Sequence, residues 1–148
     1  MRRIVMYLED EASMRLHTAE MLIEEKYDVE CFRRIDLVKE FFQKNHDEVV
    51  CVVTDLNMAD SWLGEYQCEA DGCMLSGWVW LQRFVFPARQ DMPTVIYSGY
   101  LSYLMEWLSK RGQLPLLEQS HIACVLKGVG EMEGFSGLLH ALREILHI

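Results

Sequence analysis

Acidic, hydroxyl and basic side chains stand where apolar stretches of the sequence end. Glu9 and Asp10 follow the first stretch, Asp55 follows the third, Ser98 closes the fourth and Lys127 follows the fifth. Carboxylates that cluster repel one another unless a proton or a cation neutralises them. Mg²⁺ suits such a cluster, because it prefers oxygen ligands and is usually held by one or two carboxylates. An aspartate beside a metal can also act as a phosphoryl nucleophile, so these residue types are suited to phosphoryl transfer.

Strand-like and helix-like patterns alternate along the whole chain. Short apolar or β-branched runs, typical of strands, are separated by stretches in which apolar residues recur at helical spacing. The predicted strands are residues 4–8, 28–32, 49–53, 94–98 and 121–126, and the predicted helices cover residues 12–23, 35–42, 78–85, 101–108 and 135–146. This alternation indicates a parallel sheet with right-handed crossovers and helices on both faces.

The pattern predicts a doubly wound α/β fold with a five-stranded parallel sheet in the flavodoxin-like order 2-1-3-4-5. Ligands of such sheets bind beyond the carboxyl ends of the strands, at the point where the winding reverses. Strands one and three are then neighbours, so Glu9, Asp10 and Asp55 are expected to converge there. The chain shows no internal repeat or linker, and residues 1–148 are expected to form a single domain.

Composition excludes several classes of partner. Of the 148 residues, 51% are apolar and 25% are charged, which is typical of a globular domain. The 14 basic and 23 acidic residues give a net charge of −9, so general attraction to nucleic acid or to anionic lipid is not expected. The longest apolar runs have five residues, whereas a membrane-spanning helix needs about 20.

The cysteines indicate a reducing compartment. Their number, five, is odd, and Cys51 and Cys124 lie in apolar runs that are expected to be buried strands. Reduced thiols of this kind are typical of cytosolic proteins, so a cytoplasmic location is predicted.

Four segments together resemble the receiver domains of two-component response regulators, the CheY-like family. They are residues Tyr7 to Glu11, Val53 to Met58, Pro93 to Gly99 and Val125 to Lys127. They occur in the expected order, each at the end of a predicted strand, and the resemblance covers essentially the whole chain. It implies that Asp55 accepts a phosphoryl group from the phosphohistidine of a sensor histidine kinase or phosphotransfer protein. It also implies that Mg²⁺ is held by Glu9, Asp10, Asp55 and the backbone carbonyl of Asn57.

The same resemblance assigns the conformational switch, and here the chain departs from the family pattern. Ser98 is the implied switch hydroxyl, and Lys127 is implied to pair with the phosphoryl group. Receiver domains usually have proline after this lysine, whereas this chain has Gly128, which is far more permissive and predicts a less firmly placed Lys127. The aromatic switch residue three positions before the lysine is replaced by Cys124. The residues for phosphorylation are therefore expected to be intact, whereas the usual switching residues are replaced.

An insertion at about residues 59–76 directly follows the acceptor segment. It has no clear period and is predicted to be irregular, with four acidic and no basic residues. A solvated surface loop is one interpretation. The other is an acidic lid, with Trp62, Leu63 and Tyr66 as a docking patch for a partner.

We therefore expect a stand-alone receiver in a phosphorelay that turns over no external substrate and signals through contact with an unknown output protein. The resemblance places that contact near Tyr100, Leu101, Trp107 and Cys124. The alternative is a receiver-like adaptor that binds its partner independently of phosphate. A haloacid-dehalogenase-type phosphatase is disfavoured, because Asn57 cannot serve as its general acid. The sequence leaves the oligomeric state, including a homodimer, open.

Overall fold

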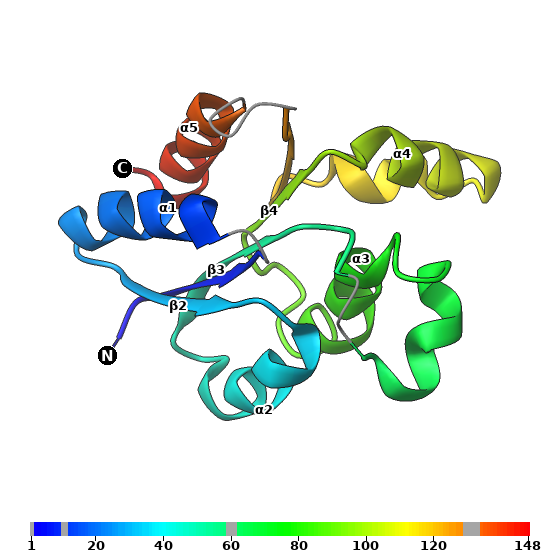
Figure 1. The fold of residues 1–148 in the computed structure, drawn as a ribbon, viewed down its shortest axis with the longest axis horizontal. Coiled ribbons are helices and arrows are strands. Elements are labelled where there is room, and N and C mark those ends of the chain that lie inside the picture. Colours follow the sequence, from blue (N-terminus) through cyan, green and yellow to red (C-terminus); the bar gives the residue numbers. More distant parts are fainter. Residues whose placement is uncertain (1, 10–11, 59–61, 129–133) are drawn as a thin grey trace.

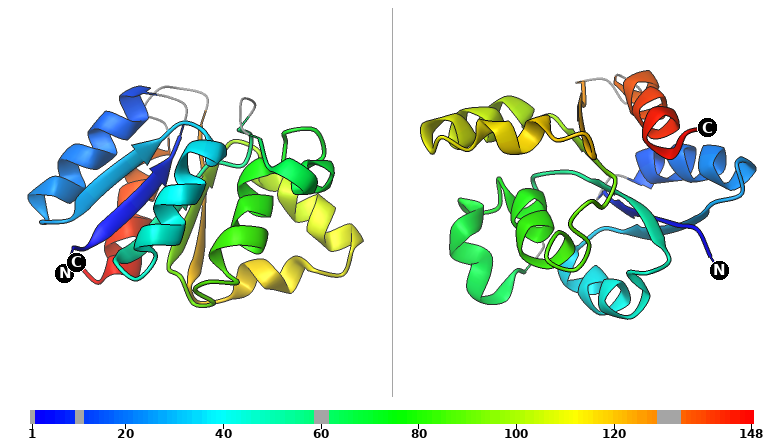
Figure 2. Two further views of the ribbon diagram at one scale, coloured as in Figure 1. Left: turned by 90° about the horizontal axis from the view of Figure 1, so that it is seen from below. Right: turned by 180° about the vertical axis from the view of Figure 1, so that it is seen from behind.

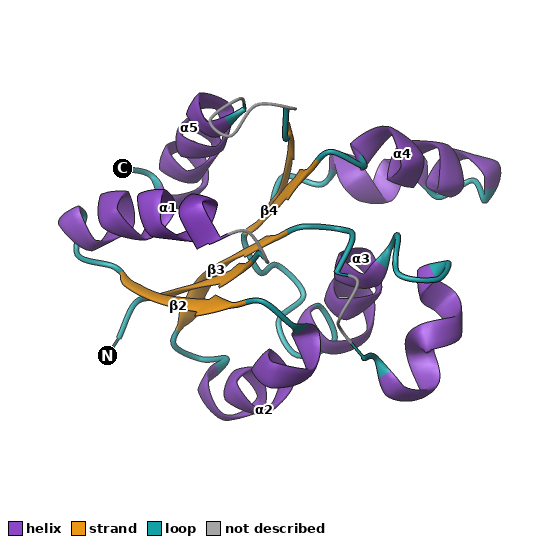
Figure 3. Cartoon of the chain, viewed as in Figure 1, coloured by secondary structure: helices purple, strands orange, loops and turns teal. Residues whose placement is uncertain are grey.

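The computed structural model describes residues 2–9, 12–58, 62–128 and 134–148. Strands and helices alternate through these ranges (Figures 1 and 3). The strands are β1 (Ile4–Leu8), β2 (Asp28–Phe32), β3 (Val49–Thr54), β4 (Thr94–Ser98) and β5 (Ile122–Leu126). The α-helices are α1 (Ala12–Glu24), α2 (Ile35–Asn45), α3 (Ser76–Trp80), α4 (Leu101–Lys110) and α5 (Phe135–Leu146). The described ranges also contain the 3₁₀ helices η1 (Gly64–Ala70) and η3 (Leu114–Glu118) and the π-helical turn η2 (Leu81–Val85).

The strands form one parallel sheet in the order β2-β1-β3-β4-β5, which confirms the predicted topology. The buried strands β1 and β4 flank β3, which is buried except for Val50. Apolar side chains on both faces of a strand require a layer of helices on each side of the sheet. The continuous apolar run at residues 49–53 is consistent with the central position of β3, where both faces are covered.

Helices cover both faces of the sheet, with α1 and α5 on one face and α2 and α3 on the other (Figures 1 and 2). Val5, Tyr7 and Val53 point toward the first layer, where Leu138 and Leu142 of α5 join them. The second layer contains the larger apolar core, to which α4 contributes Leu104 and Leu108. No described helix is both long enough and apolar enough to cross a membrane.

The prediction that both Cys51 and Cys124 are buried is half wrong. Cys51 in β3 is fully buried, and burial raises the pKa of its thiol to about 12. Cys124 in β5 is exposed. An edge strand has a neighbour on one side only, and β5 alternates between half-buried and exposed residues where a central strand would be buried throughout. An apolar run alone does not distinguish a central strand from an edge strand.

The insertion is more ordered than the sequence predicted. Residues 59–61 lie outside the described residues, but residues 64–70 form the 3₁₀ helix η1, and residue 76 already begins α3. Leu63, Ala70 and Leu75 are buried in the same core as α2 and α3. Both interpretations therefore need correction, because a solvated loop would not bury these residues and Leu63 is unavailable for a docking patch. Trp62, whose surface is 61% exposed, stays accessible.

The predicted third helix is divided into two kinds of turn. An α-helical turn, α3, passes directly into the π-helical turn η2 and ends before Pro87. Trp80 lies at this junction, fully buried, with its ring stacked on Phe84 at a centroid distance of 5.7 Å. Uninterrupted helical spacing of apolar residues could not indicate this change of pitch.

Candidate functional site

Strand register brings Glu9, Asp55 and Lys127 to one edge of the sheet. Leu8 of β1 pairs with Thr54 of β3, so the next residues along each strand, Glu9 and Asp55, are adjacent. The backbone N–H of Asp55 donates to the Leu8 carbonyl (3.1 Å). Lys127 follows β5, and its backbone N–H donates to the Ser98 carbonyl at the end of β4 (3.0 Å). Of the predicted convergence of Glu9, Asp10 and Asp55, the part that joins Glu9 and Asp55 is thus present, and Asp10 lies outside the described residues.

The Lys127 side chain joins the two carboxylates. Its Nζ lies 2.5 Å from Glu9 Oε2 and 2.7 Å from Asp55 Oδ2. The side chains are little exposed, at 1% for Glu9, 11% for Asp55 and 16% for Lys127. One positive charge therefore faces two negative charges in a site with little solvent screening. The lysine is held by these two ion pairs although Gly128, and not proline, follows it.

The carboxylates keep Lys127 protonated. Burial alone would lower the pKa of this ammonium group, but the attraction of Asp55 and Glu9 outweighs burial and raises the pKa above its ordinary value. The ammonium also lies 5.2 Å from the centroid of the buried Tyr97 ring. Lys127 is therefore a permanent positive charge beside Asp55 at neutral pH.

The backbone around Asp55 is fixed by short-range hydrogen bonds. The Leu56 N–H donates to Asp55 Oδ1 (2.6 Å), and the Thr54 hydroxyl donates to the Asp55 carbonyl (2.8 Å). Gly77 at the start of α3 donates its N–H to the Leu56 carbonyl (2.9 Å), and a Cβ at position 77 would overlap the Asp55 carbonyl. Only glycine lets α3 approach the Asp55 backbone this closely.

The other predicted site residues have separate partners. Ser98 is buried at the end of β4, where its Oγ accepts a hydrogen bond from the Tyr100 N–H (3.0 Å). Asn57 Nδ2 lies 3.9 Å from the sulfur of Met74, and Asn57 Oδ1 is buried without a hydrogen-bond partner in the described part of the chain. Asp10, a predicted metal ligand, lies outside the described residues.

The side chains at this edge have the donor chemistry that Mg²⁺ prefers. Glu9 and Asp55 offer carboxylate oxygens. The predicted ligand at Asn57 is its backbone carbonyl, and the buried side-chain oxygen of Asn57 has no hydrogen-bond partner among the described residues. Within the ranges that the structure describes, no three histidine, cysteine, aspartate or glutamate side chains are grouped for metal binding. The donor types fit magnesium, and the predicted third carboxylate, Asp10, is not among them.

Comparison with solved structures decides the fold. The non-phosphorylated receiver domain of HemR from Leptospira biflexa superposes with a TM-score of 0.65 and 16% sequence identity, over 99% of this chain and 96% of that chain. A response regulator receiver domain from Clostridium thermocellum superposes with a TM-score of 0.59 and 16% sequence identity, over 98% of each chain. A CheY-like receiver domain protein from Methanospirillum hungatei JF-1 superposes with a TM-score of 0.57 and 17% sequence identity, over 99% of this chain and 98% of that chain. The chain has the receiver-domain fold. No protein-family model matches the sequence, and no curated protein matches it.

The receiver fold presents α4, β5 and α5 at one end of the sheet, and the expected contact residues there differ in accessibility. Tyr100 and Cys124 are exposed, and Trp107 is half-buried. Leu101, in contrast, is buried in the core under α4. It is therefore not available for a partner contact, because the first turn of α4 points it toward the sheet.

The sequence did not reveal the contacts that attach the insertion to the rest of the receiver fold. Arg83 of η2 donates two hydrogen bonds to Glu69, at 2.9 and 2.8 Å, and the Tyr103 hydroxyl of α4 donates to Asp71. Thr54 was also missed as a support for Asp55. The clue for Thr54 is its position directly before Asp55, but no local pattern connects Asp71 with a tyrosine 32 residues away.

The receiver fold is expected to lose stability as the pH rises above about 10, where unperturbed tyrosine and lysine begin to lose their protons. Burial raises the pKa of Tyr7, and the pKa of Lys127 is also raised. The folded chain therefore keeps both protons at pH values at which the unfolded chain has lost them. Each group's contribution to the free energy of unfolding is complete at pH values below the pKa that the group has in the unfolded chain. Above that pKa the contribution declines by about 1.4 kcal/mol per pH unit.

Urea unfolding between about pH 9 and about pH 11 measures this decline. The Tyr7→Phe variant, which lacks the phenol, should decline less steeply than the wild type. Equal slopes for the two proteins would show that the Tyr7 phenol does not resist ionisation in the folded state.

Proposed function

We propose that this chain is a receiver that accepts a phosphoryl group on Asp55 and signals through protein contacts. The observation that supports the proposal is the position of Lys127 Nζ between Asp55 and Glu9 at the carboxyl edge of the sheet. A carboxylate nucleophile needs nearby positive charge, because phosphorylation adds negative charge to a buried, already acidic site. Lys127 supplies that charge without any change in its own protonation.

In the proposed step, a carboxylate oxygen of Asp55 attacks the phosphorus of a phosphohistidine. A new P–O bond forms and the P–N bond breaks, with its electron pair going to the imidazole nitrogen, which then takes up a proton. The donor is a sensor histidine kinase or a phosphotransfer protein. Water later attacks the same phosphorus, which releases inorganic phosphate and restores the Asp55 carboxylate. The chain would thus act on its own side chain and on no metabolic substrate.

Magnesium would be held by Glu9, Asp55 and Asn57, with Asp10 as the further candidate outside the described residues. The bound ion would supply positive charge against the phosphoryl oxygens. Glu9, Asp55 and Lys127 together carry a net charge of −1, so the unmodified site still favours a cation. The role of this chain's own residues is to orient the acceptor, through the Leu56 N–H and the Thr54 hydroxyl, and to keep Lys127 beside it.

Intact-mass spectrometry after incubation with Mg²⁺ and acetyl phosphate tests the proposal. The wild type should gain one phosphoryl adduct, and Asp55→Asn should gain none, because an amide is not a nucleophile of this kind. Asp47→Asn is the matched control, since Asp47 is exposed and remote from the sheet edge. An adduct that persists in Asp55→Asn would assign the acceptor to another residue and overturn the proposal. If the wild type gains no adduct from acetyl phosphate or from a phosphorylated histidine phosphotransfer protein, the acceptor function itself is wrong.

A second function, that of a phosphate-independent adaptor, is favoured by the exposed thiol of Cys124 at the position of the usual aromatic switch residue. On this proposal the domain has one conformation whether or not Asp55 is modified. Amide NMR spectra with and without acetyl phosphate distinguish the two functions. A phosphorylated receiver that switches should shift amides of α4 and β5, whereas an adaptor should change only within a few residues of Asp55.

A further inference from the structure

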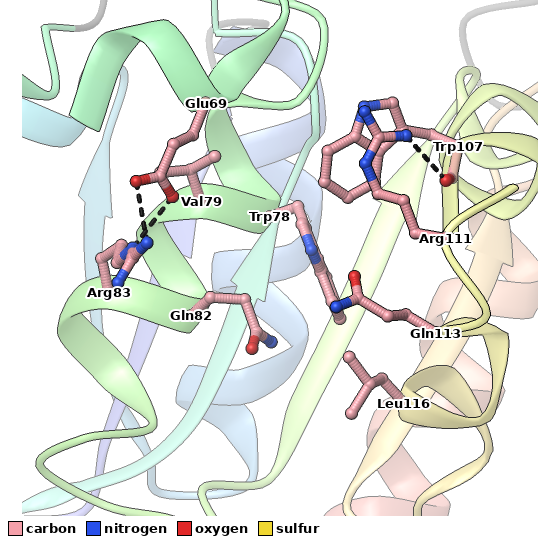
Figure 4. Close-up of a pocket in the computed structure, with 9 residues that line it drawn as sticks. All are labelled: Glu69, Trp78, Val79, Gln82, Arg83, Trp107, Arg111, Gln113 and Leu116. Atoms are coloured by element: carbon pink, nitrogen blue, oxygen red, sulfur yellow. Dashed lines mark hydrogen bonds and ion pairs between the residues drawn. The ribbon is translucent and has the colours of Figure 1, made fainter. Parts of the chain in front are cut away.

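A groove runs between the insertion and α4, away from the acceptor site. It consists of two adjoining cavities of about 380 and 330 Å³. The two cavities share Glu69, Trp107 and Arg111. One wall is made by η1, α3 and η2, and the other by α4 and the η3 segment (Figure 4). The groove therefore depends on the insertion, which supplies part of one wall.

Aromatic and apolar side chains share the lining with charged and amide side chains. Trp78 of α3 borders the groove on one wall with only 3% of its surface exposed, and Trp107 of α4 and Leu116 of η3 face it from the other (Figure 4). Tryptophan and arginine are the residue types that contribute most to binding where they line a partner's contact surface. The combined size is within the range of about 300–1,000 Å³ that is common for binding pockets.

Not every charged side chain of the groove has an ion-pair partner among the described residues. The Glu69 carboxylate accepts two hydrogen bonds from Arg83, and Asp71 accepts one from the Tyr103 hydroxyl. The Arg111 guanidinium lies 3.7 Å from the centroid of the Trp107 ring and donates to the Trp107 carbonyl (3.1 Å). Among the described residues, no carboxylate lies within ion-pair distance of Arg111. A guanidinium stacked on an aromatic ring is pre-oriented, and its remaining donors suit one carboxylate.

We propose that this groove binds an extended segment of a partner protein in which an acidic residue stands next to large apolar residues. The proposal rests on the proposed function, because it identifies where that function's output partner makes contact. Arg111 pairs with the partner's carboxylate, and the surface formed by Trp107 and Leu116, next to the buried Trp78, receives its apolar side chain. The contact lies on the insertion side of α4, away from β5.

The shape and the charge of the groove select this kind of partner. Two cavities in series suit an extended chain better than a compact ligand. A polyanion such as RNA needs several basic residues, whereas this groove has one arginine without a carboxylate partner in a chain of net charge −9. A single charge-assisted pair beside an apolar surface suits one acidic residue flanked by large apolar residues.

The insertion also connects the groove with Asp55. Met74 lies between η1 and α3, and its sulfur is 3.9 Å from Nδ2 of Asn57, two residues after Asp55. The wall that carries Glu69 is therefore in contact with the Asp55 segment, while the wall that carries Arg111 belongs to α4 and η3. A change at Asp55 that displaces the insertion would alter the width of the groove.

NMR titration of the uniformly ¹⁵N-labelled full chain tests the proposal. The probes are the blocked peptide acetyl-Leu-Glu-Phe-amide and its neutral isostere acetyl-Leu-Gln-Phe-amide, in a buffer of about 0.15 M salt, where charge repulsion is screened beyond about 8 Å. The acidic peptide should shift the indole N–H signals of Trp78 and Trp107 with a Kd on the order of 1 mM. The signals of Trp62 and Trp80, which do not line the groove, should stay in place.

Variants identify the charge that is recognised. Arg111→Gln should weaken the binding of the acidic peptide about tenfold, as expected for the loss of one charge-assisted hydrogen bond. Lys110→Gln, which removes a neighbouring charge that is paired with Glu106 outside the groove, should leave the affinity within about twofold.

Three results would overturn the proposal. They are equal affinity for both peptides, equal affinity in Arg111→Gln and wild type, and the absence of indole shifts at Trp78 and Trp107. The titration uses unphosphorylated protein and is repeated on Asp55→Asn, so its outcome does not depend on phosphorylation. A missing phosphoryl adduct would refute the proposed function, whereas missing peptide binding with a normal adduct would refute the groove alone.

Discussion

Replacing Lys127 with methionine is expected to lower the free energy of unfolding by about 3 kcal/mol. Methionine keeps most of the apolar stem but removes the ammonium group that lies within 2.7 Å of both Glu9 and Asp55. Two largely buried carboxylates would then face each other without a positive charge. Removing one partner of a buried ion pair is costly because the remaining charge stays desolvated. Urea unfolding at neutral pH measures the loss.

A double variant separates charge from packing. In Asp55→Asn/Lys127→Met one of the two negative charges is also removed, so the double variant should be more stable than Lys127→Met alone. The control is Lys110→Met, which breaks an exposed pair with Glu106 and should change stability by no more than about 0.5 kcal/mol. If Lys127→Met were as stable as the wild type, the carboxylates would have to be hydrated, contrary to their low exposure.

Magnesium gives an independent readout of the same variant. If Glu9 and Asp55 hold the ion, Mg²⁺ should raise the unfolding free energy of Lys127→Met more than that of the wild type, because no ammonium group competes for the carboxylates. An equal effect of Mg²⁺ on both proteins would contradict this assignment of the ligands.

The sheet and the edge at which Glu9 meets Asp55 could be predicted from the sequence because they depend on local information. Strand length, apolar periodicity and the residue that follows each strand are properties of short segments, and parallel register then aligns Glu9 with Asp55. The bounds of β1, β2 and β4 were predicted to the residue. The ion pair between Lys127 and Glu9 could not be predicted, because the two residues are 118 positions apart in the sequence.

The insertion could not be predicted because its order depends on partners elsewhere in the chain. Its acidic residues indicate a solvated loop when they are considered alone. In the folded chain Glu69 pairs with Arg83, Asp71 accepts a hydrogen bond from Tyr103, and Leu75 is buried. The same limit applies to Cys124, because whether an apolar strand is central or at the edge is a property of the whole sheet.

Gly77→Ala is the second substitution with a large expected effect, and two opposing terms decide its sign. Alanine is favoured over glycine within a helix by about 1 kcal/mol, and Gly77 lies in the first turn of α3. The added methyl group, however, would overlap the Asp55 carbonyl and lie 3.0 Å from the Thr54 hydroxyl oxygen. The overlap is between the backbone of α3 and that of Asp55, so one of these two segments has to move to relieve it. Overpacking of this kind costs typically 1–3 kcal/mol, and we expect a value at the upper end.

The net result should be a destabilisation of about 2 kcal/mol, which lowers Tm by roughly 7 °C for a chain of this length. Gly99→Ala is the matched control at the same edge of the sheet. Its nearest neighbour, the Lys127 carbonyl, is 3.6 Å from the position of the added Cβ, an ordinary van der Waals distance. That variant should stay within about 0.5 kcal/mol of the wild type. If Gly77→Ala were instead more stable than the wild type, helix propensity would outweigh the contact, and α3 would have room to move away from Asp55. Because the overlap involves the Asp55 backbone, the destabilised variant should also be phosphorylated more slowly by acetyl phosphate, whereas Gly99→Ala should not.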